Sequence, residues 1–109
     1  MTYIRVEQSE RLVLRDKVGE IAIIALGQHN GQWFFSVSHQ QRTGDMWGYF
    51  GGIGYREGER GSDSRDGALA AAIVHARARW ANRTREMAAH IAWLDTLIPA
   101  QPDLFGAAA

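Results

Sequence analysis

The chain of 109 residues contains no cysteine. Disulfide bonds and thiolate chemistry are therefore excluded, and with them a disulfide-stapled secreted scaffold. Net charge is also absent, because 12 basic side chains balance 12 acidic ones, so no overall field draws the chain to nucleic acid or to an anionic membrane. A small domain without net charge tends to associate, which favours a homodimer.

Long hydrophobic runs are missing as well. Nothing approaches the roughly 20 apolar residues that cross a membrane. The N-terminal segment carries charges where a signal peptide needs an apolar run, so we expect a cytoplasmic protein. The length suits a single domain with a modest core, which we assign to 1–98, followed by a tail over 99–109.

The first half of the chain predicts antiparallel strands. Alternating residues predict half-buried strands over 2–8 and 11–15, and the apolar run over 20–26 predicts a more buried one. Asn30-Gly31 tolerates the positive φ angles of a two-residue type I′ turn and therefore predicts a hairpin.

After that turn, Trp33, Phe35 and Val37 fall on one face of a strand. The glycine-rich aromatic segment 46–55 predicts the last strand. Its glycines do not match a phosphate loop, which needs a helix directly after them, and a bulge is the expected role. They also offer a place for a helix to approach the sheet closely.

The segment 65–98 predicts an amphipathic helix. Its large apolar residues recur at alternating steps of three and four. Asp63 and Ser64 suit its N-terminus, and Pro99 ends it. The predicted fold is α+β: a four- to five-stranded antiparallel sheet followed by one long or bent helix across one face.

A continuous helix of this length would extend about 50 Å. Strands commonly span roughly 17–20 Å, so the helix would overhang the sheet. Either the chain bends near 81–84 into a helix pair, or the C-terminal half projects and packs on a second copy. Continuity with self-association is the preferred interpretation, and Trp80 and Trp93 are expected to be buried anchors.

Catalytic and metal-binding patterns are not recognisable in this sequence. The four histidines, His29, His39, His75 and His90, lack the spacing of a metal pair and are interpreted as scattered surface residues. No nucleophile stands in a triad or elbow context. We therefore expect a non-enzymatic protein that uses no cofactor and no metal.

One local cluster of basic residues lies in the predicted helix, at Arg77, Arg79, Arg83 and Arg85. Contact with nucleic-acid phosphates, or with a protein, is one interpretation. The other is a solvated helix face on which Arg83 pairs with Glu86. Zero net charge favours the solvated face.

The tail contains the sequence QPDLF, from Gln101 to Phe105. This resembles the short peptide by which many bacterial DNA-metabolism proteins dock on the replicative sliding clamp. The residues that match are Gln101, Asp103, Leu104 and Phe105, while Pro102 stands where leucine is usual. The resemblance implies that the clamp is a protein partner and that these residues bind it.

The tail also has a second interpretation, in which Leu104 and Phe105 fold back onto the core of this chain or of a dimer partner. The body otherwise is similar to small phage- or plasmid-encoded accessory proteins, including inhibitors of host defence systems. Our main hypothesis is a non-enzymatic accessory protein of DNA metabolism recruited to the clamp. The alternatives are an inhibitor that binds a defence-system component and a weak nucleic-acid-binding domain that uses the helix arginines.

Overall fold

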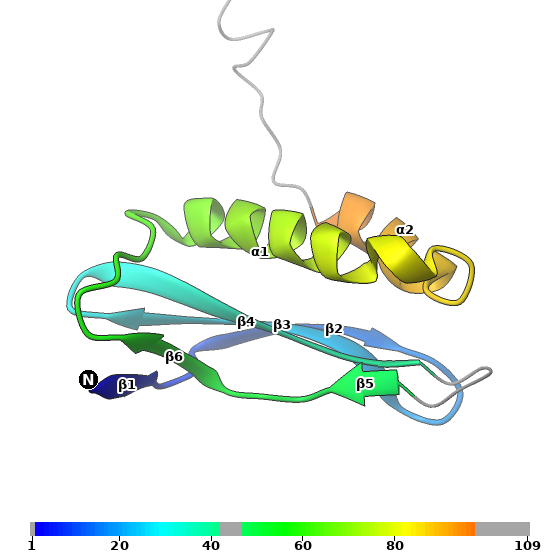
Figure 1. Ribbon diagram of the computed structural model, residues 1–109, viewed down its shortest axis with the longest axis horizontal. Coiled ribbons are helices and arrows are strands. Elements are labelled where there is room, and N and C mark those ends of the chain that lie inside the picture. The colour runs from blue at the N-terminus through cyan, green and yellow to red at the C-terminus, as the bar shows by residue number, and fades with distance from the viewer. Residues whose placement is uncertain (1, 42–46, 98–109) are drawn as a thin grey trace, which may run out of the picture.

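The computed structural model describes residues 2–41 and 47–97 and shows an α+β fold, as predicted. Two helices lie over one face of a sheet, and a small two-stranded sheet lies against the other face (Figure 1). No helix in the described ranges combines the length and the apolar character needed to cross a membrane.

The larger sheet has four antiparallel strands in chain order. These are β2 (Glu10–Arg15), β3 (Glu20–His29), β4 (Gln32–Gln41) and β5 (Trp47–Tyr49). The predicted hairpin is confirmed, because Asn30 and Gly31 join β3 to β4 with φ angles of 52° and 79°. These positive angles match a type I′ turn, whose twist suits the strands on either side.

The smaller sheet pairs β1 (Tyr3–Val6) with β6 (Ile53–Arg56). The prediction of one last strand over 46–55 is therefore wrong: the segment supplies β5 to one sheet and β6 to the other. Between the two strands, residues 50–52 include Gly51 and Gly52, and the chain changes sheets there. Glycine suits this change because its backbone conformations are the least restricted.

The helical segment is bent, so the continuous helix is wrong and the helix pair is confirmed. It consists of α1 (Arg65–Trp80), the 3-10 turn η1 (Ala81–Arg83) and α2 (Ala88–Thr96). The Ser64 hydroxyl accepts a 2.9 Å hydrogen bond from the Gly67 amide and caps α1. The bend sets α2 beside α1 (Figure 1) instead of beyond the sheet. The helical segment therefore does not overhang the sheet, which removes one reason to expect a dimer. Self-association itself stays a prediction.

The main core lies between the helices and the upper face of the four-stranded sheet. Alternate residues of β3 and β4 face the helical stripe, because successive side chains of a strand point to opposite faces. Trp80, Met87 and Leu94 are fully buried there, so the apolar stripe keeps its phase across the bend. The other members are Ala22, Ile24, Leu26, Val37, Ala68, Leu69, Ala72, Ile73 and Ala76.

A second, smaller core joins the two sheets. It contains Val6, Ala25, Phe34 and Ile53, with the Tyr55 ring stacked on Phe34 at 4.1 Å. The strands approach closely here: a Cβ atom at Gly27 would lie 2.3 Å from the carbonyl oxygen of Glu7. A side chain at this position would therefore separate the layers.

Candidate functional site

The residues that carry the clamp resemblance lie outside the described part of the chain. They are Gln101, Asp103, Leu104 and Phe105. Their assignment as a partner-binding segment stays a prediction from the sequence.

Two of the four helix arginines make specific contacts near the end of α1. Arg77 forms an ion pair with Asp95 of α2 and so links the two helices. Arg79 donates a 2.7 Å hydrogen bond to the carbonyl oxygen of Val37 in β4, and its second terminal nitrogen lies 2.7 Å from Nε2 of His75. Both side chains therefore serve contacts within the fold.

The other two arginines differ in their surroundings. Arg83 donates to the side-chain oxygen of Gln41 at 3.2 Å and lies over the Trp47 ring, 4.5 Å from its centre. The expected pairing of Arg83 with Glu86 is therefore wrong, since the sheet offers an acceptor and an aromatic face. Arg85 is exposed. The arginines thus do not form one basic face.

Two aromatic side chains of β5 contact Arg79 and Arg83. Trp47 has Arg83 on its ring and the His39 ring 4.3 Å away. Tyr49 lies under the guanidinium of Arg79 at 5.1 Å. Each contact is a cation–π interaction, which contributes about 0.5–1 kcal/mol at exposed sites. No local sequence pattern predicts this arrangement, because it joins Tyr49 to Arg79 and Trp47 to Arg83 on different elements.

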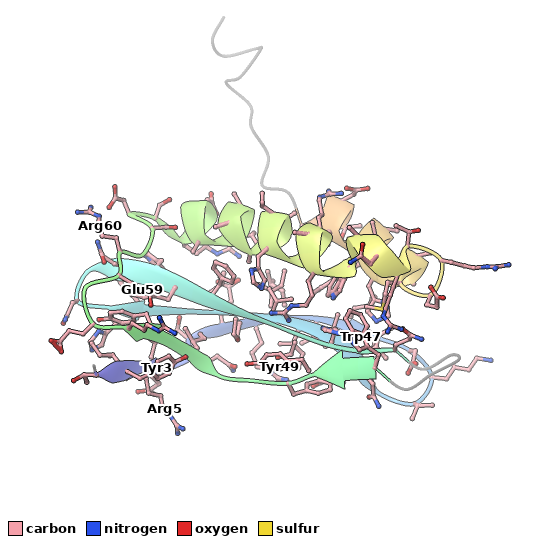
Figure 2. All side chains as sticks on the ribbon, in the orientation of Figure 1. Tyr3, Arg5, Trp47, Tyr49, Glu59 and Arg60 are labelled. Carbon is pink, nitrogen blue, oxygen red and sulfur yellow. The ribbon has the colours of Figure 1, made fainter. Side chains whose placement is uncertain are left out.

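An open cleft of about 380 Å³ lies between β1 and the segment that joins β5 to β6. Its lining includes Tyr3, Arg5, Gln8 and Tyr49. Figure 2 shows Tyr3 and Arg5 on the strand layer that lies farther from the helices. Tyr3 is 66% exposed and Tyr49 is 51% exposed, so both rings present large apolar surfaces to solvent.

The glycines of segment 51–54 support these rings. A Cβ atom at Gly54 would lie 2.4 Å from the Tyr3 ring, and one at Gly51 would lie 2.2 Å from the Tyr49 hydroxyl oxygen. The expectation that these glycines admit the helix is therefore wrong: the helices pack on β3 and β4, while the glycines make room for tyrosines.

Two histidines are buried beside Trp80, which corrects the interpretation of all four as surface residues. His39 is 1% exposed and His90 is 4% exposed. Their rings lie 5.8 Å and 5.6 Å from the Trp80 ring. His39 continues the inward face of Trp33, Phe35 and Val37, so the strand alternation contained the signal for its burial.

Burial sets the protonation state of this pair. It lowers the pKa of His39 to about 4, with further contributions from the charges of Arg79 and His90. Burial also lowers the pKa of His90, although the hydrogen bond from its Nε2 to the Gln40 carbonyl oxygen, at 3.0 Å, acts in the opposite direction. Both rings are therefore neutral near pH 7.

These histidines do not form a metal centre with other ligands. Within residues 2–41 and 47–97, no three side chains of histidine, aspartate or glutamate gather closely enough to hold an ion. His29 lies on another part of the sheet, where its Nδ1 is 2.9 Å from the Tyr55 hydroxyl oxygen.

Comparison with known proteins identified no relative of this chain. No protein-family model matches the chain, and neither a curated protein nor a solved structure shows significant similarity to it. Any functional assignment therefore depends on the chemistry of the residues themselves.

Proposed function

We propose that this chain is a non-enzymatic binding protein of bacterial DNA metabolism, recruited to the sliding clamp through its C-terminal segment. The observation that carries the proposal is the sequence Gln101-Pro102-Asp103-Leu104-Phe105, which resembles the clamp-binding peptide. The proposal places the protein in the cytoplasm, where the clamp works.

Two large apolar residues of the segment would supply most of the binding free energy. Burial of Leu104 and Phe105 in a preformed pocket would contribute roughly 1.5–3 kcal/mol each, before the cost of ordering the segment. Gln101 would supply a hydrogen bond at the pocket rim. Pro102 would reduce the ordering cost if its fixed φ angle suits the bound form.

The apolar stripe of the helical segment is buried inside the body of the protein, so a separate peptide is a reasonable docking element. Trp80, Met87 and Leu94 are buried between the helices and the sheet. Recruitment by a terminal peptide and a closed body are therefore compatible. The body would then hold a second molecule while the segment 101–105 holds the clamp.

A pull-down with purified bacterial sliding clamp tests the proposal. The intact chain is compared with a chain that ends at Ala100 and with a matched control that lacks only Ala108 and Ala109. We expect the intact chain and the control to recover the clamp and the chain ending at Ala100 to lose it. Equal recovery by all three would show that the segment is not the docking element.

A further inference from the structure

Two exposed tyrosine rings line the same cleft in the strand layer. Tyr3 comes from β1 and Tyr49 from β5, and the cleft between them has a volume of about 380 Å³. Both rings keep more than half of their surface in contact with solvent. Exposed apolar surface concentrated in this way is typical of a binding site.

The fold holds both rings in place without burying them. The Tyr3 ring lies against the backbone of Gly54. The hydroxyl end of Tyr49 lies close to Gly51, and its ring lies under the guanidinium of Arg79. Arg79 is itself fixed by its hydrogen bond to Val37. Because the rings are ordered before a ligand arrives, binding would cost less conformational entropy.

One charged side chain, that of Arg5, lines this cleft among the described residues, and no carboxylate lines it. Arg56 is the register partner of Tyr3 and therefore points to the same side of the two-stranded sheet. Among the described residues, neither Arg5 nor Arg56 forms an ion pair.

A second cleft continues the aromatic surface. It has a volume of about 270 Å³ and shares Tyr49 with the first. Phe50, which is 54% exposed, and Trp47 line it together with Gln40 and Gly48. Tyr49 therefore lines two clefts, one shared with Tyr3 of β1 and one shared with Phe50 and Trp47.

We propose that this surface binds single-stranded nucleic acid, with bases stacked on Tyr3 and Tyr49 and a phosphate held by Arg5. Aromatic rings beside a cationic groove are how sequence-tolerant proteins hold single strands. A duplex is disfavoured, since its bases are already stacked and their faces are not accessible. The proposal replaces the helix arginines as the nucleic-acid contact, because three of those four are engaged within the fold.

This inference does not depend on the clamp segment. A chain that ends at Ala100 retains the cleft, because all of its lining residues precede position 54. It should therefore bind the oligonucleotide as the full chain does. Loss of clamp binding and loss of nucleic-acid binding are separate results.

The test is fluorescence anisotropy of the full chain with a labelled 12-nucleotide oligothymidylate, a duplex of equal length and a proline-rich peptide. The variants are Tyr3→Ala, Tyr3→Phe, Tyr49→Ala, Arg5→Ala and, as the control, Arg85→Ala, each verified as folded by circular dichroism. Tyr3→Ala should raise the Kd for the oligonucleotide about 5- to 150-fold, the range of one lost base–aromatic stack. Tyr3→Phe and Arg85→Ala should retain binding.

Salt dependence separates stacking from phosphate contact. Arg5→Ala should lower the slope of log K against log salt by about 0.7, the contribution of one phosphate contact on a single strand, whereas Tyr3→Ala should leave the slope unchanged. Three outcomes would overturn the proposal: no salt-sensitive binding of the oligonucleotide by the unmodified chain, loss of binding in Arg85→Ala but not in Tyr3→Ala, or binding of the peptide in place of the oligonucleotide.

Discussion

The guanidinium carbon of Arg79 lies 5.1 Å from the centre of the Tyr49 ring, while the same side chain donates a 2.7 Å hydrogen bond to the Val37 carbonyl oxygen. One arginine of α1 thus joins β4 and β5, and it fixes a ring that is half exposed. Through Arg79, α1 therefore contacts both strands and restrains the Tyr49 ring at the edge of the sheet.

Removal of this contact should destabilise the fold. Arg79→Ala leaves the Val37 carbonyl without its charged donor, and such a loss costs about 1–3 kcal/mol. We expect the free energy of unfolding in urea to fall by that amount. The matched control is Arg85→Ala, at an exposed position of the same segment, which should stay within about 0.5 kcal/mol of the unmodified chain. Equal effects of the two substitutions would refute the bridging role of Arg79.

Stability should decrease in mild acid because of His39. Its pKa is about 4 in the folded protein and about 6.5 in the unfolded chain, so the unfolded state takes up a proton first. The contribution is therefore complete above pH 6.5 and is lost as the pH falls towards 4, by an amount on the order of 3 kcal/mol. Melting temperatures between pH 8 and pH 4 measure it.

Two variants separate the titration from the packing. His39→Gln removes one titrating group and should reduce the pH dependence by the contribution of His39, leaving that of His90. Trp80→Phe disturbs the same buried cluster but retains both histidines, so it should lower the melting temperature at every pH and keep the slope. An unchanged slope in His39→Gln would assign the acid sensitivity to other groups.

Much of this fold could be predicted from the sequence, because the signals are local. The Asn30-Gly31 turn, the Ser64 cap and the apolar stripe through Trp80 and Leu94 each depend on neighbouring residues or on a period. The bend was one of two predicted solutions, since the stripe has the same phase in a straight helix and in a helix pair. The choice between them depends on the length of the sheet.

The candidate surface could not be predicted in the same way. The contact of Arg79 with Tyr49 and that of Tyr3 with Gly54 join distant segments, and no local pattern specifies either. Strand alternation predicts an inward position for His39, whereas the polarity of histidine predicts a surface position, and the structure follows the alternation. The clamp segment differs from this surface, because the resemblance depends on residues 101–105 alone and needs no contact between distant segments.

The glycine at position 54 should matter for the tyrosine surface and the one at position 52 should not. Gly54→Ala would push a methyl group into the Tyr3 ring, whereas a Cβ atom at Gly52 meets nothing within 4 Å. Tyr3 is 66% exposed, so displacing its ring removes little buried surface, and we expect a loss of oligonucleotide affinity with little loss of stability. Anisotropy and urea denaturation of the two alanine variants measure both effects, and equal affinities would contradict the role of Gly54.

Position 102 should tune the affinity for the clamp. Pro102→Leu restores the residue usual in the peptide that the tail resembles, and an added apolar contact should lower the Kd roughly 10-fold. Pro102→Ala adds no such contact and is the matched control. Surface plasmon resonance with immobilised clamp compares the three chains, and a weaker complex with leucine than with alanine would speak against the resemblance.

The most direct test of the account is the Kd of the full chain for a bacterial sliding clamp, measured by isothermal titration calorimetry with and without the double substitution Leu104→Ala and Phe105→Ala. The account predicts a saturable complex whose Kd rises about 30-fold or more in the double variant, since two apolar side chains leave their pocket. No detectable heat of binding with the unmodified chain, or the same Kd in both proteins, would contradict it.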